Sequence, residues 1–277
     1  MDWLYYLKTV ILGIVEGLTE FLPVSSTGHL ILSGHLIGFN DAGADTFYVA
    51  IQAGAIVAVC WHYRLRIIAV LMNLFKPGKE QRLAVNTVIA FLPAAVLGVM
   101  VSGYIKEHFF NAFSVAVALV VGGIVILWIE RMHEKKHFVP RVATMDDMTW
   151  KDALGVGLMQ CFALIPGTSR SGATIIGGLL LGLSRTAATE FSFFLAIPTI
   201  FGATVYDLYK SRDILSIDNL PGIGVGFVVS FFSAIVVVRW LLRYVSKNDF
   251  RIFGWYRIVF GLLILGLYFA GFGQIFS

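Results

Sequence analysis

The sequence predicts an all-α protein that crosses a membrane several times, built as two related halves. Of its 277 residues, 58% are hydrophobic and 14% are charged, whereas a soluble domain carries roughly 25% charged residues. The mean hydropathy is +0.81, and apolar runs recur at close to the roughly 20 residues that a spanning helix needs. The net charge of +4 comes from basic residues gathered between these runs, so we expect no nucleic-acid partner.

A weak internal repeat divides the chain. A shift of 144 residues aligns the two halves without a gap, and each half is expected to hold a helical hairpin with a polar break, followed by three spans. The aligned pairs are Gly13 with Gly157, Glu16 with Gln160, Ser25 with Ser169, Gly28 with Gly172, Gly34 with Gly178 and Gly38 with Gly182.

The first half covers residues 1–130. We expect a re-entrant hairpin over 1–40, because the polar stretch 23–28 separates two apolar arms that are short for a bilayer, at about 12–20 residues each. Three ordinary spans follow, at 46–63, 83–103 and 112–129.

Residues 131–151 form a basic loop between the halves. The stretches 64–82 and 239–251 are similarly rich in lysine and arginine, and the remaining connections are poorer in both. Since basic loops stay on the cytoplasmic side, we expect these three stretches to be cytoplasmic.

The second half covers residues 152–277, with a hairpin over 152–185 and spans at 189–208, 222–242 and 253–276. Because three spans separate the two hairpins, the second hairpin enters the membrane from the opposite side. This pattern predicts an inverted-topology repeat. Irregular backbone at membrane depth is tolerated only inside protein or against a wet cavity, so the two polar tips are expected to meet near the midplane.

The first polar tip lies in EGLTEFLPVSSTGHL, residues 16–30. Glu16 and Glu20 are four residues apart and share one helix face. Each carboxylate costs roughly 2.5–3.5 kcal/mol inside a membrane, and a divalent cation or an arginine would relieve the cost. Pro23 ends the helix, and the residues after it supply three hydroxyls and a histidine that can move protons near neutral pH: Ser25, Ser26, Thr27 and His29.

The second polar tip lies in LIPGTSRSGAT, residues 164–174. Pro166 and Gly167 open a turn, after which a new helix starts and presents backbone N–H groups that attract anions. Arg170 adds a fork that can hold two phosphate oxygens. In the absence of a ligand, Arg170 is also a partner for Glu16 or Glu20. Further donors are the hydroxyls of Ser169, Ser171 and Thr174.

Together, the two tips contain the groups that phosphoryl transfer requires: carboxylates for a metal, an arginine, a histidine and hydroxyl nucleophiles. The apolar surroundings favour a lipid-borne phosphate as substrate. A secondary transporter or flippase is the alternative, because inverted repeats with broken helices are typical of transporters. In that case Glu16, Glu20 and His29 would couple protons, and Arg170 would bind an anionic substrate.

The two motifs resemble those of the bacterial undecaprenyl-diphosphate phosphatases of the bacitracin-resistance type. The resemblance rests on residues 16–30 and on PGTSRSGAT at 166–174, and the pattern of spans extends it over the whole chain. It implies hydrolysis of a C55 polyprenyl diphosphate to the monophosphate carrier of cell-wall synthesis. It also implies a divalent cation, Mg²⁺ or Ca²⁺, and a site open to the outer, periplasmic face of the bacterial cytoplasmic membrane.

By position, the resemblance assigns Glu16 and Glu20 to an acidic motif, Arg170 to phosphate binding, and Ser26 and His29 to catalysis. Our hypothesis is that Ser26 attacks the terminal phosphorus and His29 takes its proton. In a rival scheme, His29 or Glu20 activates water and Ser26 only binds. The sequence does not decide between them, nor whether the chain forms a homo-oligomer or also flips lipid.

Overall fold

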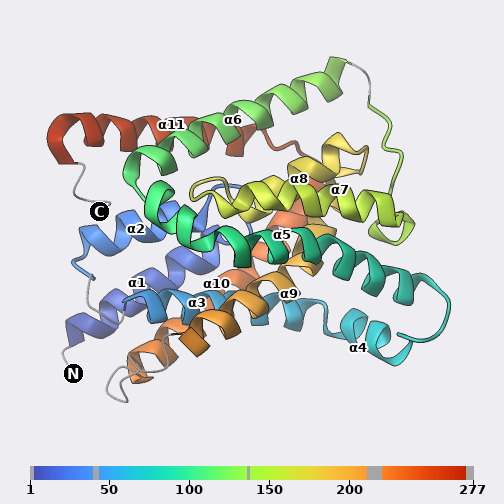
Figure 1. Ribbon diagram of the computed structural model, residues 1–277, viewed down its shortest axis with the longest axis horizontal. Helices are drawn as coiled ribbons and strands as arrows, with labels where there is room; N and C mark the ends of the chain where they lie inside the picture. The colour runs from blue at the N-terminus through green and yellow to red at the C-terminus, as the bar shows by residue number, and fades with distance from the viewer. Residues whose placement is uncertain (1–2, 40–43, 136–137, 211–219, 273–277) are drawn as a thin grey trace.

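The computed structural model describes residues 3–39, 44–135, 138–210 and 220–272, which form a bundle of helices (Figure 1). Within these ranges the regular elements are helical, apart from one isolated bridge between Val142 and Leu183. The predicted all-α class is therefore confirmed. Parts of the predicted segments lie outside the described residues: 1–2 and 40 of the first hairpin, 136–137 of the basic loop, and 273–276 of the last span.

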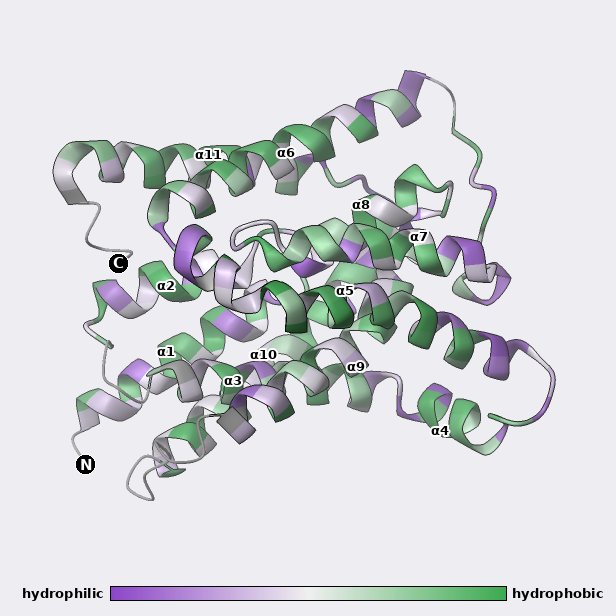
Figure 2. Ribbon diagram, in the orientation of Figure 1, coloured by the Kyte–Doolittle hydropathy of each residue, from purple (hydrophilic) through white to green (hydrophobic). Residues whose placement is uncertain are grey.

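All six predicted spans correspond to helices. Among the described residues, five helices are long and apolar enough to cross a bilayer, and α3 passes the same test together with the short helix that follows it. The six are α3 (Ala44–His62), α5 (Lys79–Phe109), α6 (Ala112–Lys135), α9 (Arg185–Lys210), α10 (Leu220–Val245) and α11 (Arg251–Leu267). Figure 2 shows hydrophobic residues along these helices and hydrophilic ones at the start of α5 and the end of α6.

The stretch 64–82 differs from the predicted loop because it contains α4 (Arg64–Met72), which is bent by 74° from α3. This helix has no buried residues, and Leu65 and Leu71 are largely exposed beside its arginines. An exposed apolar face flanked by basic residues is typical of a helix that lies in the membrane interface.

The two hairpins enter the bundle from opposite ends (Figure 1). The first consists of α1 (Trp3–Thr19) and α2 (Ser26–Leu36) and lies toward the end where the chain starts. The second consists of α7 (Trp150–Gln160), the 3₁₀ turn η2 (Cys161–Leu164) and α8 (Arg170–Leu180). Their tips meet in the interior, where the Ser171 hydroxyl donates to the Leu22 carbonyl over 2.8 Å.

The packing of the halves repeats in part. Helix α1 packs against α10, and α7 packs against α5; α6 packs against α11, and α3 against α9. Gly13 and Gly157, which the 144-residue shift aligns, both permit close contact: an added Cβ would lie 2.6 Å from the Gly226 carbonyl oxygen and 2.4 Å from the Ala90 carbonyl oxygen. The inverted orientation of the halves across a membrane stays a prediction.

The three basic stretches meet at one end of the bundle. Arg66 pairs with Asp146, and Arg82 donates to the Asp146 carbonyl over 2.6 Å, which joins the 64–82 and 131–151 regions. At the end of α6, Glu130 pairs with Arg185 and accepts from the Phe250 N–H over 2.9 Å. Stretches that lie on one side of a membrane must lie at one end of the bundle, and these do.

We predict that Gly157→Ala weakens the fold. The new methyl group would collide with the α5 backbone at Ala90, and overpacking of this kind costs about 1–3 kcal/mol. Thermal unfolding in detergent measures the effect. Gly224→Ala is the matched control, because an added Cβ there meets no atom of the described part of the chain within 4 Å. Equal unfolding temperatures for the two variants would contradict the prediction.

Candidate active site

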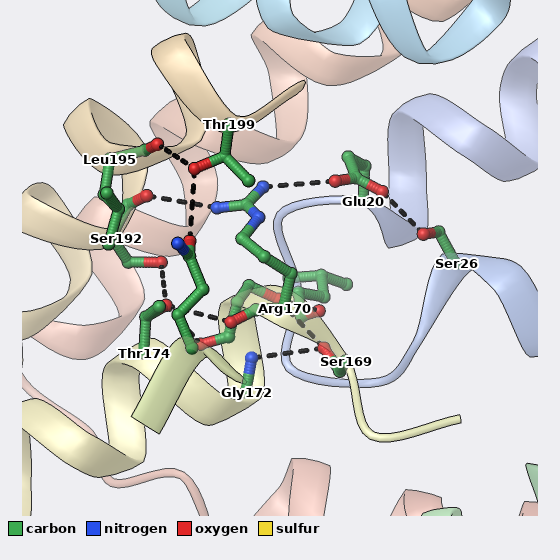
Figure 3. A network of polar contacts seen from close by, with 12 residues as sticks. Glu20, Ser26, Ser169, Arg170, Gly172, Thr174, Ser192, Leu195 and Thr199 are labelled. Carbon is green, nitrogen blue, oxygen red and sulfur yellow. Dashed lines mark hydrogen bonds and ion pairs between the residues drawn. The ribbon is translucent and has the colours of Figure 1, made fainter. Parts of the chain in front are cut away.

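An ion pair joins the two hairpin tips. The Nη2 atom of Arg170, the first residue of α8, lies 3.1 Å from Oε1 of Glu20, which follows α1 in the first hairpin (Figure 3). The side chains are 12% and 4% exposed. The structure therefore brings together the carboxylate and the arginine that lie 150 residues apart in the sequence.

The backbone at both tips adopts the same unusual turn. Ser25 and Ser169 each have a φ of 71° and directly precede α2 and α8. A positive φ costs a non-glycine residue of order 1–3 kcal/mol, and such strain gathers at functional sites. At Ser169 the hydroxyl caps the new helix by accepting from the Gly172 N–H over 3.1 Å. These turns bring Ser26 and Arg170, the first residues of α2 and α8, into contact with Glu20.

Glu20 also holds the hydroxyl of Ser26. The Ser26 Oγ donates to Oε2 of Glu20 over 2.5 Å, while Oε1 receives Arg170 (Figure 3). Ser26 is 9% exposed. A hydroxyl whose proton points at a buried carboxylate is the arrangement of an activated nucleophile with its base.

Glu16 lies one turn before Glu20 and is completely buried. Neither of its carboxylate oxygens has a hydrogen-bond partner among the described residues. A buried carboxylate without a hydrogen-bond partner is costly, and a bound cation would offset that cost. The described residues contain no cluster of three or more His, Cys, Asp or Glu side chains that could hold a metal ion. Two carboxylates nevertheless fit Mg²⁺, which is held by one or two carboxylates, water and substrate phosphates.

Arg170 is fixed from the other side by α9. Its Nη1 donates to the Ser192 carbonyl over 3.0 Å, and the hydroxyls of Ser192 and Thr174 lie 2.7 Å apart (Figure 3). Ser192 is not among the residues predicted from the sequence, where it is only a polar residue inside an apolar span. Its carbonyl aims the guanidinium at Glu20.

The predicted phosphate-binding hydroxyls of the second tip are mostly occupied by the protein itself. Ser169 caps α8, Ser171 binds the first tip, and Thr174 also donates to the Arg170 carbonyl over 3.0 Å. The Gly167 carbonyl accepts from an arginine of α11. In the first tip, Thr27 lies half-buried in the first turn of α2.

The ring of His29 is held against α11. In the neutral imidazole, Nδ1–H donates to the Ser25 carbonyl over 2.7 Å, and Nε2 accepts from the Tyr256 hydroxyl over 2.5 Å. The ring also stacks on Phe260, with centroids 4.3 Å apart. Both ring nitrogens are thus occupied, and the base that contacts Ser26 in this structure is Glu20.

The family model described as bacitracin resistance protein BacA matches residues 9–263. The chain belongs to this family. The matched BacA region includes both hairpin tips and all the site residues described above.

Curated relatives extend the similarity over nearly the full chain. The undecaprenyl-diphosphatase of Nitrosomonas europaea is 58% identical over 273 residues, which cover 98% of this chain and 97% of that protein. Those of Herminiimonas arsenicoxydans and Cupriavidus metallidurans are 57% and 56% identical, each with 96% of both chains covered.

We predict that substitutions of Glu20 and Arg170 have non-additive effects on the stability of the fold. Arg170→Gln alone leaves a buried carboxylate without its partner, which costs about 3–5 kcal/mol. Adding Glu20→Gln removes that charge, so the double variant should unfold at a higher temperature than Arg170→Gln. Unfolding of the wild type, both single variants and the double variant in detergent measures the coupling. Additive effects would show that the contact contributes nothing to stability.

Proposed function

We propose that this chain is a bacterial membrane phosphatase that hydrolyses undecaprenyl diphosphate to undecaprenyl phosphate and inorganic phosphate. The observation that carries the proposal is the Ser26 hydroxyl donated to Glu20 beside Arg170, in a chain whose relatives are undecaprenyl-diphosphatases. The product is the lipid carrier that peptidoglycan synthesis requires.

In the first step, the Ser26 Oγ attacks the terminal phosphorus, and Glu20 takes its proton at Oε2. The bond from that phosphorus to the bridging oxygen breaks, and undecaprenyl phosphate leaves with the bridging oxygen. Arg170 turns from Glu20 to the phosphate oxygens, which its planar fork can hold in pairs. The terminal phosphoryl group is then on Ser26.

In the second step, water attacks the phosphorus of the phosphoserine. The bond from Ser26 Oγ to phosphorus breaks, and Glu20 returns its proton to the serine oxygen. One proton of the attacking water stays on the released phosphate and the other goes to solvent, so each turnover releases one proton with inorganic phosphate. Glu20 rather than His29 is the base in this scheme, because it already accepts the Ser26 hydrogen bond. A catalytic role for His29 stays a prediction.

We propose that Glu16 and Glu20 hold a divalent cation, Mg²⁺ or Ca²⁺. The support is the fully buried Glu16 carboxylate, whose two oxygens have no hydrogen-bond partner among the described residues. When bound, the cation would neutralise charge on the diphosphate. Protein sites often bind Mg²⁺ through one or two carboxylates, while water and substrate phosphates supply the other ligands. Two carboxylates are therefore enough from the protein.

We further propose that the enzyme lies in the cytoplasmic membrane and takes its substrate from the periplasmic side. The three basic regions at one end of the bundle support this orientation under the positive-inside rule. The α1–α2 hairpin would then open toward the periplasm. Formation of a homo-oligomer stays a prediction.

We predict that Ser26→Ala lowers phosphate release from undecaprenyl diphosphate by at least about 1000-fold, because the nucleophile is lost. Release by purified protein in detergent measures this. Ser33→Ala, a serine further along α2, is the control.

The rival scheme with water as the direct nucleophile is separated by trapping. Brief reaction with substrate labelled in the terminal phosphate should leave label on Ser26 of the wild type. Full activity of Ser26→Ala would rule out the proposed nucleophile. A folded wild type that releases no phosphate would favour the transporter instead.

For the cation, we predict that chelator abolishes activity and that Glu16→Gln weakens cation binding at least about tenfold, since half of the protein's carboxylate ligands are lost. Titration with Mn²⁺, followed by electron paramagnetic resonance, measures binding without turnover. Glu134→Gln, at an exposed carboxylate on α6, is the control. Equal Mn²⁺ affinity in Glu16→Gln and wild type would contradict the assignment.

A further inference from the structure

Arg257 of α11 lies between the two hairpin tips and is 1% exposed. It donates five hydrogen bonds, one from each N–H of its guanidinium. The acceptors are five backbone carbonyl oxygens: Leu119 at 3.3 Å from Nε, Pro23 at 3.2 Å and Thr168 at 2.9 Å from Nη1, and Ala118 at 3.1 Å and Gly167 at 3.0 Å from Nη2.

These carbonyls belong to three separate parts of the chain. Pro23 lies in the first tip, Gly167 and Thr168 lie in the second, and Ala118 and Leu119 belong to α6. Two of the contacts are close to the proposed chemistry: Pro23 precedes Ser26 by three residues, and Thr168 precedes Arg170 by two. One side chain therefore restrains the backbone on both sides of the site.

Two glycines give this guanidinium room between α6 and the second tip. A Cβ at Gly122 of α6 would lie 2.2 Å from Nη2 and 2.7 Å from Cζ. Gly167 has a φ of 89°, and a Cβ there would lie 2.4 Å from the Val115 carbonyl oxygen. The two glycines let α6 and the second tip approach closely enough for Arg257 to reach both.

The tips need a connection that survives the reaction. The Glu20–Arg170 pair joins them without substrate, but Arg170 must exchange Glu20 for phosphate when substrate binds. The acceptors of Arg257 among the described residues are backbone carbonyls, so its hydrogen bonds are independent of that exchange. Broken helices also expose carbonyls that must find donors at membrane depth.

We infer that Arg257 is a positioning residue that holds both hairpin tips against α6 and so sets the placement of Ser26 relative to Arg170. This inference rests on the proposed function. Lysine cannot replace it, because an ammonium group offers three donors without the planar fork.

The test compares two variants that disturb the guanidinium from different sides, Arg257→Lys and Gly122→Ala. Each should lower kcat per folded molecule by about 10- to 100-fold, the effect of a small misplacement of reacting groups, with a smaller change in KM. Because both variants act on one element, the double variant should be no worse than the more affected single one.

Two variants on the same helix serve as controls. Arg251→Lys makes the same exchange at a partly exposed ion pair with Glu134. Gly266→Ala adds a methyl group where no atom of the described residues lies within 4 Å. Both should retain wild-type kcat.

Hydrogen–deuterium exchange gives a second readout that does not depend on activity. In Arg257→Lys and Gly122→Ala, the backbone amides of residues 20–27 and 165–172 should exchange faster, while the α3 and α10 amides stay as in wild type. If Arg257→Lys does not fold, Gly122→Ala decides.

Unchanged exchange in both tips, or a kcat per folded molecule equal to that of wild type, would overturn the inference. A wild type without phosphatase activity would instead refute the proposed function. The exchange data would then still decide whether Arg257 holds the tips.

Discussion

The ion pair between Glu20 and Arg170 is the contact on which the site depends. Each charge alone would be expensive inside a membrane protein, and each comes from a hairpin that ends in the interior of the bundle. Pairing makes both charges tolerable and at the same time fixes the two hairpins tip to tip. The geometry of the site therefore follows from the need to compensate buried charge.

The arrangement of the site allows Arg170 to exchange Glu20 for a phosphate. Glu20 divides its two oxygens between Arg170 and Ser26, so a phosphate that takes Arg170 leaves one carboxylate oxygen free while the other still holds the nucleophile. Glu16 adds a second buried carboxylate, whose oxygens accept no hydrogen bond from the described residues. An anionic substrate that arrives with a cation would satisfy both the arginine and the carboxylates. This charge balance favours a diphosphate over a neutral ligand.

The rest of the fold holds the two hairpins in fixed positions relative to each other. Glycines at the α1–α10 and α7–α5 contacts bring backbones close together, and the ion pairs at the basic end join α6 to the start of α9 and α11. Helix α11 then contributes neighbouring side chains to the site from one side: Tyr256 to His29, and Arg257 to the carbonyls of both tips. A helix that looks like an ordinary span is thus part of the active-site framework.

The sequence by itself determined the spans, the hairpin breaks and the residues that can take part in catalysis or binding. These are local properties: bilayer thickness sets the length of an apolar run, and proline and glycine interrupt helices wherever they occur. The common face of Glu16 and Glu20 likewise follows from helical spacing alone. Only the tertiary structure decided that Ser26 contacts Glu20 while His29 turns to Tyr256, 227 residues away. It also revealed Ser192, whose backbone carbonyl accepts from Arg170, and Arg257, which donates to backbone carbonyls. Every residue has such a carbonyl, so no sequence pattern marks the acceptor, and the pairing is set by how the helices pack.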